Sequence, residues 1–140
     1  MVIVAAVDRS DRATDVCEQA EILAQAFDDR VHVVHVLTRS DFFDLGRTSA
    51  EAEESISMDD VRGVAADVAA EAAANVDVEW EAVGLVGDPA DRVVDYADEH
   101  DARYVVVAGR KRSPAGKMIF GSVAQTVLLT ADCPVVSSIE

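Results

Sequence analysis

Short apolar runs and amphipathic segments alternate along the chain. Two continuous apolar runs, Val2–Val7 and Tyr104–Ala108, favour buried strands, and the valine-rich segment Val31–Leu37 predicts a further strand. Each falls far short of the ~20 apolar residues that a membrane-spanning helix needs. Apolar and polar residues alternate from about Val76 to Val83, which predicts a strand solvated on one face, at an edge of a sheet. A short final strand is predicted to start within Cys133–Val136.

Between these strands, apolar residues recur at the spacing of amphipathic helices. The first helix follows Ser10 and Asp11, either of which can cap it. A second helix is predicted from about Met58 to Ala74, after a polar stretch from about Arg39 to Met58 that we interpret as a long loop. The inner faces of these two helices are predicted to carry Val16, Ala20, Leu23, Ala24 and Phe27, and Val61, Val64, Ala65, Val68 and Ala72, respectively.

Two further helices have recognisable start signals. In Gly87-Asp88-Pro89, Asp88 is predicted as the N-cap and Pro89 as the first helical residue, where its missing N–H does no harm. Ser122 is predicted to cap the fourth helix, which ends near Thr130. The apolar stripe of the third helix is formed by Ala90, Val93, Val94 and Ala97.

Five strands alternating with four helices predict an α/β fold, in which helices cover both faces of a parallel sheet. We expect one domain over residues 1–140, without an internal repeat or linker. In such sheets ligands bind at the carboxyl ends of the strands, where the strand order reverses. Asp8 follows the first strand and Gly109 the fourth, so both face one crevice if these strands are neighbours.

The segment after the fourth strand carries the most specific chemistry in the sequence. Gly109 ends the strand, and Gly121-Ser122 opens a helix. A glycine loop that leads into a helix N-terminus offers free backbone N–H groups and a positive dipole end, which together favour phosphate. The loop also holds a third of the twelve basic residues: Arg110, Lys111, Arg112 and Lys117.

The remainder of the chain is strongly acidic, with a formal net charge of −15 for the whole sequence. Such a chain is a poor general partner for nucleic acid, whose phosphates it repels. Aspartate outnumbers glutamate, and Lys111 and Lys117 are the only lysines, a pattern that favours adaptation to high salt in a halophilic archaeon. The alternative is an ordinary acidic protein. Without a secretion signal or a membrane span, we expect a cytoplasmic protein with Cys17 and Cys133 reduced.

Catalytic motifs are absent from the sequence. It contains no GxSxG, no HExxH and no P-loop ending in GK[ST], so we expect at most slow, incidental ATP hydrolysis. His32 and His35 lie on opposite faces of one strand, so they cannot jointly hold a metal. We interpret both as core or edge residues with satisfied hydrogen bonds.

Taken together and in order, six segments make the chain similar to the universal stress protein family over essentially its whole length. The segments are Val4–Ser10, His35-Val36, Gly87-Asp88-Pro89-Ala90, Val105–Gly109, Gly121-Ser122-Val123 and Cys133-Pro134-Val135-Val136. The resemblance implies strand order 3-2-1-4-5 and a homodimer paired through the last strand, at Val135 and Val136. Some members of the family bind ATP and others do not.

The resemblance also implies a role for individual residues. Asp8 would accept a hydrogen bond from the nucleotide, Ala6 and Val7 would line the base, and Val36 would meet adenine through its backbone. Ala108 and Gly109 would lie under the ribose and the phosphates. The phosphates would be bound by backbone N–H groups of Gly121, Ser122 and Val123 and by the Ser122 hydroxyl, with any Mg²⁺ held mainly by the phosphates. Without the resemblance, Asp8 and Ser122 are simply helix-capping residues.

The basic loop departs from the pattern of the ATP-binding members. Arg112 stands where those members carry a second glycine, and the following spacer is one residue shorter. Gly116 can supply the lost backbone freedom, and Arg112 can replace a backbone contact with a charged one. Two hypotheses follow: a homodimer that binds ATP or another adenine nucleotide, and a dimerisation and interaction module of the same fold without a nucleotide. A weak ATPase ranks third.

Overall fold

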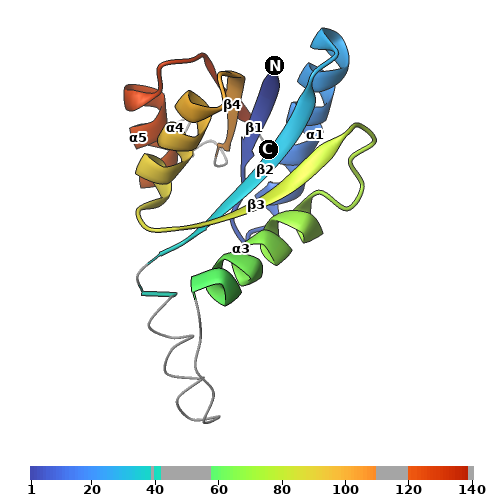
Figure 1. Ribbon diagram of the computed structural model, residues 1–140. Helices are drawn as coiled ribbons and strands as arrows, with labels where there is room; N and C mark the ends of the chain where they lie inside the picture. The colour runs from blue at the N-terminus through green and yellow to red at the C-terminus, as the bar shows by residue number, and fades with distance from the viewer. Residues whose placement is uncertain (39, 42–57, 110–119, 139–140) are drawn as a thin grey trace, which may run out of the picture.

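The computed structural model describes residues 1–38, 40–41, 58–109 and 120–138. Its centre is a parallel five-stranded sheet in the order β3-β2-β1-β4-β5 (Figure 1), which confirms the predicted fold class and strand order. The strands are β1 (Val2–Ala6), β2 (Arg30–Leu37), β3 (Trp80–Val86), β4 (Ala102–Ala108) and β5 (Val135–Ser138). The long loop predicted from about Arg39 to Met58 lies almost entirely outside the described residues.

Helices cover the sheet on both faces (Figure 1). They are α1 (Arg12–Phe27), α3 (Met58–Ala72), α4 (Pro89–Glu99) and α5 (Ser122–Thr130). Because side chains alternate along a strand, one set from β1 and β2 packs under α1 and α3, and the other packs under α4 and α5. Ile3 and Val33 belong to the first core layer, and Val4 and Val34 belong to the second. No helix among the described residues could cross a bilayer.

The third strand begins four residues later than predicted and ends at Val86 instead of Val83. The N–H of Val76 donates to the carbonyl of Ala73, and the N–H of Asp77 donates to Glu21 Oε1, so this stretch is held outside the ladder. Val76 and Val78 nevertheless pack against the core, which explains their alternation. The predicted edge position of the strand is confirmed.

The helix starts follow the sequence signals unevenly. The carboxylate of Asp88 accepts the N–H of Asp91 at 3.1 Å, and Pro89 opens the helix, as predicted. The prediction that Ser122 caps α5 is wrong, because Ser122 is the first helical residue and Gly121 occupies the N-cap position. At α1 the Oγ of Ser10 accepts the N–H of Arg12 at 3.3 Å.

One residue predicted on the buried face of a helix lies elsewhere. Phe27, predicted on the buried face of α1, is 42% exposed and lies beside Tyr104, with the Arg103 guanidinium over its ring. It closes the end of the helix instead of entering the core. The last strand begins at Val135, within the predicted Cys133–Val136 segment.

Candidate functional site

A cavity of about 410 Å³ opens at the carboxyl ends of β1, β2 and β4. Strand β1 pairs with β2 on one side and with β4 on the other, so the cavity lies at the point where the strand order reverses. The starts of α1, α4 and α5 complete its wall. The cavity brings together these residues singled out from the sequence: Ala6, Val7, Asp8, Val36, Ala108, Gly121, Ser122 and Val123.

The remaining sequence-predicted site residues lie elsewhere. Gly109 does not line the cavity, and its N–H donates to the carbonyl of Ser138 at 2.8 Å, which extends the pairing of β4 with β5. That amide is therefore already engaged within the fold. Arg112 and Gly116, with the rest of the basic loop, lie in 110–119, outside the described residues.

The start of α5 is the part of the cavity best suited to an anion. Gly121 is extended, with φ −68° and ψ 166°, and no side chain of the described residues caps the helix. Within the described residues, the backbone N–H groups of Ser122 and Val123 find no acceptor. Free N–H groups and the positive end of the helix dipole thus face the same space, and such an arrangement attracts phosphate or carboxylate groups.

Asp8 combines a structural contact with a free oxygen. Its Oδ1 accepts hydrogen bonds from the backbone N–H of Ser10 at 2.8 Å and from the Ser10 hydroxyl at 2.5 Å. This contact orders the turn before α1, in line with the capping role considered from the sequence alone. Its Oδ2 makes no hydrogen bond to the described residues, so one carboxylate oxygen remains for a ligand.

The backbone of Val36 faces the cavity because β1 ends before β2. The carbonyl of Val34 accepts the N–H of Val7 at 2.9 Å, so the peptide groups of Val34 point towards β1. In a parallel ladder this orientation repeats every second residue, so those of Val36 point the same way. The last paired residue of β1 is Ala6, opposite Val34. The peptide groups of Val36 therefore point past the end of β1, into the cavity that Val36 lines.

Arg12 and His35 also line the cavity, although sequence reasoning did not assign them to a site. His35 Nδ1 lies 2.9 Å from the carbonyl oxygen of Val7, but its Nε2 is buried without a partner in the described part of the chain. The expectation of a fully hydrogen-bonded His35 is thus only half correct. The Nε of Arg12 is likewise buried and unpartnered among the described residues. In the sequence, Arg12 is unusual because it places a positive charge in the first turn of a helix, where the helix dipole disfavours a cation.

The histidine predicted on the other face of β2 is fully engaged. His32 Nδ1 lies 2.6 Å from the Tyr96 hydroxyl, and its Nε2 lies 3.4 Å from Glu81 Oε2. Among the described residues, no group of three or more histidine, cysteine, aspartate or glutamate side chains is placed to hold a metal.

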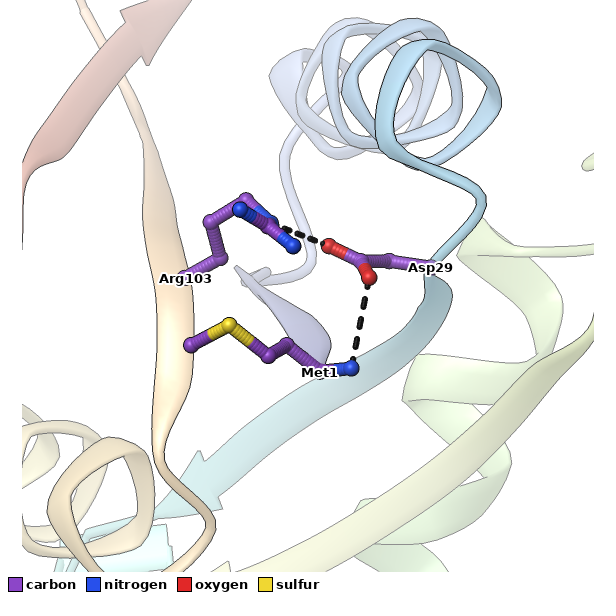
Figure 2. A network of polar contacts seen from close by, with 3 residues as sticks. All are labelled: Met1, Asp29 and Arg103. Atoms are coloured by element: carbon purple, nitrogen blue, oxygen red, sulfur yellow. Dashed lines mark hydrogen bonds and ion pairs between the residues drawn. The ribbon is translucent and has the colours of Figure 1, made fainter.

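A second hollow, of about 670 Å³, lies at the opposite ends of the strands, around Met1, Asp29 and His100. Its buried carboxylate is already satisfied. Asp29 Oδ2 accepts from Arg103 Nε at 2.6 Å, and Oδ1 lies 3.3 Å from the amino group of Met1 (Figure 2). The first hollow, with unengaged donors and acceptors at the switch point, is the better candidate for a ligand site.

Comparisons with known proteins agree with this architecture. A family model described as the universal stress protein family matches residues 1–137. A universal stress protein structure from Archaeoglobus fulgidus is 38% identical, with a TM-score of 0.71, over 98% of this chain and 97% of that one. A structure of the universal stress protein from the same organism, in complex with dAMP, is 30% identical, with a TM-score of 0.66, over 98% and 96% of the two chains.

A curated relative agrees with the structural matches. A universal stress protein of Methanocaldococcus jannaschii is 26% identical over 133 residues, which cover 95% of this chain and 78% of that protein. The family model spans nearly the whole chain, and the two matched structures are covered almost end to end. This chain therefore belongs to the universal stress protein family.

Proposed function

We propose that this protein binds an adenine nucleotide in the cavity at the ends of β1, β2 and β4, with the phosphate at the start of α5. The observation that carries the proposal is the uncapped N-terminus of α5, which opens into the same cavity as the Val36 backbone and the free oxygen of Asp8. The Archaeoglobus fulgidus structure with 30% identity contains dAMP, which is consistent with this ligand class.

The walls of the cavity suit the two ends of a nucleotide. Val36, Val93 and Val107 provide apolar surface for a base, and the amides of Ser122 and Val123 provide donors for a phosphate. The volume, about 410 Å³, falls within the usual range of small-molecule sites, roughly 300–1,000 Å³. Arg9 and Arg12 offset Asp8 and Asp41 in the lining, so the cavity is far less acidic than the chain as a whole.

ATP is one nucleotide that this proposal includes. Its additional phosphates would need positive charge or Mg²⁺ near α5, and a Mg²⁺ ion bound mainly by phosphate oxygens requires few protein ligands. A direct comparison of ATP with AMP, each with and without Mg²⁺, measures what the additional phosphates contribute.

Calorimetric titration of ATP, AMP and dAMP in molar KCl tests the proposal. We expect saturable binding by the wild-type protein and loss of binding in Gly121→Val, because a branched side chain at the N-cap blocks the amides. Gly63→Val is the matched control, since a Cβ atom at Gly63 meets nothing within 4 Å. Absence of heat and of a thermal shift at millimolar nucleotide would favour the alternative, an interaction module without a nucleotide.

We also propose a homodimer that pairs through β5, which lies at an edge of the sheet. The carbonyls of Pro134 and Ser138 accept the N–H groups of Val105 and Gly109, so these residues face β4. Ser137, between them, presents its peptide groups to the free edge, because orientation alternates along a strand. Light scattering should find a wild-type dimer and a folded Ser137→Pro monomer. A variant that remains dimeric would place the interface elsewhere.

A further inference from the structure

Helix α5 presents an apolar face to solvent. None of its nine residues is charged, whereas charged residues make up 28% of the whole chain. Leu129 is 85% exposed and Leu128 is 41% exposed, and both lie in the last turn of the helix. On the inner side of α5, Ala124 and Val127 are already buried in the core. Most of Leu129 and a large part of Leu128 therefore remain available for an external contact.

An acidic stripe of α4 runs alongside α5. The two helices pack against each other on one face of the sheet (Figure 1). Asp91, Asp95 and Asp98 are exposed and recur at i, i+4 and i+7, so they lie along one side of α4. Asp132 follows the end of α5, and its side chain is close enough to that of Asp98 for a hydrogen bond. The last turns of α4 and α5 thus bring carboxyl groups together close to the exposed leucines.

The described part of the fold does not neutralise this negative charge. None of its ion pairs involves Asp95, Asp98 or Asp132. Neither helix has a basic residue in its last turn, where a cation would offset the negative end of the helix dipole. Desolvation raises the pKa of Asp98, and so do the neighbouring Asp132 and Asp95. A positive charge supplied from outside would therefore be stabilised here.

We infer that these leucines and carboxylates form a docking surface for a basic amphipathic helix of a partner protein. The surface consists of Leu128, Leu129, Asp95, Asp98 and Asp132. Apolar side chains of the partner cover Leu129, and its lysine or arginine side chains reach the carboxylates at the rim. The surface lies at the opposite end of α5 from the amides that face the cavity. The inference goes beyond the proposed nucleotide function and does not depend on it.

A second copy of this chain fits the surface poorly. In a two-fold symmetric dimer, a patch that meets its own counterpart places the same residues of both copies near one another. Asp98 and Asp132 would then approach the carboxylates of the other copy, and like charges brought together oppose association. A basic partner has the opposite effect, because a chain with a net charge of −15 attracts it over a distance.

A synthetic helix built from leucine and lysine is the probe for this surface. One control peptide replaces its lysines with glutamate, and a second control replaces its leucines with glutamine. We expect saturable binding of the leucine–lysine peptide alone, with one peptide bound per chain. Binding should weaken from low salt to molar KCl, because salt screens the charge contacts. Calorimetric titration measures the affinity and the stoichiometry.

Two variants of the protein locate the binding site. Leu129→Gln should weaken the peptide by at least about tenfold, because the burial of one leucine side chain is lost. Asp98→Asn combined with Asp132→Asn should weaken it by about threefold, as expected for exposed charge contacts, and should reduce the salt dependence. Ile22→Gln and Asp67→Asn are the matched controls, because they change an exposed apolar and an exposed acidic residue on α1 and α3, across the sheet. Both should bind the peptide as the wild-type protein does.

Several outcomes would overturn the inference. If the leucine–lysine peptide does not bind, or if Leu129→Gln and the double aspartate variant bind it as tightly as wild type, this surface is not a docking site. Equal binding of the glutamate control would mean that the partner is not basic. If Leu129→Gln converts a wild-type dimer into a monomer in light scattering, a second copy covers this face instead. Thermal unfolding checks that the variants are folded, and every substituted residue is exposed.

Discussion

Arg103 Nε lies 2.6 Å from Asp29 Oδ2, which ties β4 to the turn between α1 and β2 (Figure 2). The Asp29 side chain is only 3% exposed, and its other oxygen lies 3.3 Å from the amino group of Met1. This arrangement closes the end of the sheet opposite the candidate site. The hydrogen bond from Arg103 lowers the pKa of Asp29 against the opposing effect of burial.

Asp29→Asn should reduce the free energy of unfolding at pH 7 by about 1–3 kcal/mol, because the charge-assisted contacts to two cationic groups are lost. Since the pKa of Asp29 is lower in the folded chain than its ordinary value of about 3.9, the unfolded chain binds a proton first. This contribution is therefore complete above about pH 4 and lost as the pH falls through the folded value. Urea unfolding of both proteins at pH 7 and pH 3 measures it.

Asp28→Asn is the matched control for this prediction. Asp28 adjoins Asp29 but has left-handed backbone angles, φ 56° and ψ 42°, which asparagine adopts readily. We expect its unfolding free energy to stay within about 0.5 kcal/mol of wild type. If the Asp29→Asn variant were as stable as wild type at pH 7, the ion pair would contribute nothing.

Gly84 on β3 is required for the close approach of α3. A Cβ atom at Gly84 would lie 2.0 Å from the carbonyl oxygen of Arg62 and 2.6 Å from the backbone nitrogen of Ala66. Both atoms belong to the helix backbone and cannot move aside. Gly84→Ala should therefore destabilise the protein by about 2–4 kcal/mol, through displacement of α3 from the sheet.

Gly63, on the outer face of the same helix, should respond in the opposite direction. A Cβ atom there meets nothing within 4 Å, so Gly63→Ala should stabilise the protein by about 0.5–1 kcal/mol through helix propensity. Thermal and urea unfolding of the pair measure both effects. Equal effects of the two substitutions would contradict the packing of α3 on β3.

The fold could be predicted from the sequence because its strongest signals are local. The strand segment Val31–Leu37 and the Asp88-Pro89 start of α4 each specify one element. Because the crossover connections between parallel strands are right-handed, an alternating order of strands and helices is compatible with few topologies. The start of β3 could not be predicted in the same way. Val76 and Val78 alternate because both are half-buried against the core, yet the backbone there bonds to Ala73 and Glu21, which lie outside the sheet.

The candidate site was predicted less completely, for a physical reason. Asp8, Val36 and Gly121 are found by motif and strand-end position, and the cavity includes all three. His35 looked like an ordinary core residue, because no sequence pattern reveals whether a buried ring nitrogen has a partner. From its motif, Gly109 was expected to lie under the phosphates, but its N–H donates to the carbonyl of Ser138, at the end of the last strand. This hydrogen bond is a tertiary contact, which the sequence around Gly109 does not reveal.

Cys17 should be almost unreactive in the folded protein. Its side chain is buried on the face of α1 that packs against the sheet. Burial, with a smaller contribution from the charge of Glu18, raises the pKa of the Cys17 thiol to about 11. Only the thiolate reacts with disulfide reagents, and it is scarce at pH 8. In Cys133→Ser, which isolates Cys17, we expect slow labelling at pH 8 and rapid labelling in denaturant. Rapid labelling of the folded variant would contradict the burial of this helix face.

His32 should make the protein less stable in mild acid. Its Nδ1 lies 2.6 Å from the Tyr96 hydroxyl on α4. Burial lowers the pKa of His32, although the nearby Glu81 raises it, and His100 and Arg30 lower it further. The folded chain therefore takes up this proton less readily than the unfolded chain. The resulting stability is complete above about pH 6.5 and is lost as the pH falls below it.

Comparison with His32→Asn isolates this effect. Asparagine keeps an amide near the position of Nδ1 for the Tyr96 hydroxyl but does not titrate, and the other two histidines are the same in both proteins. Between pH 8 and pH 5 the wild-type protein should lose more unfolding free energy than the variant. Proton NMR of the His32 ring should give a midpoint below about 6.5. A midpoint at or above that value would mean that Glu81 outweighs burial, and the acid sensitivity of the wild-type protein would then have to come from its carboxylates.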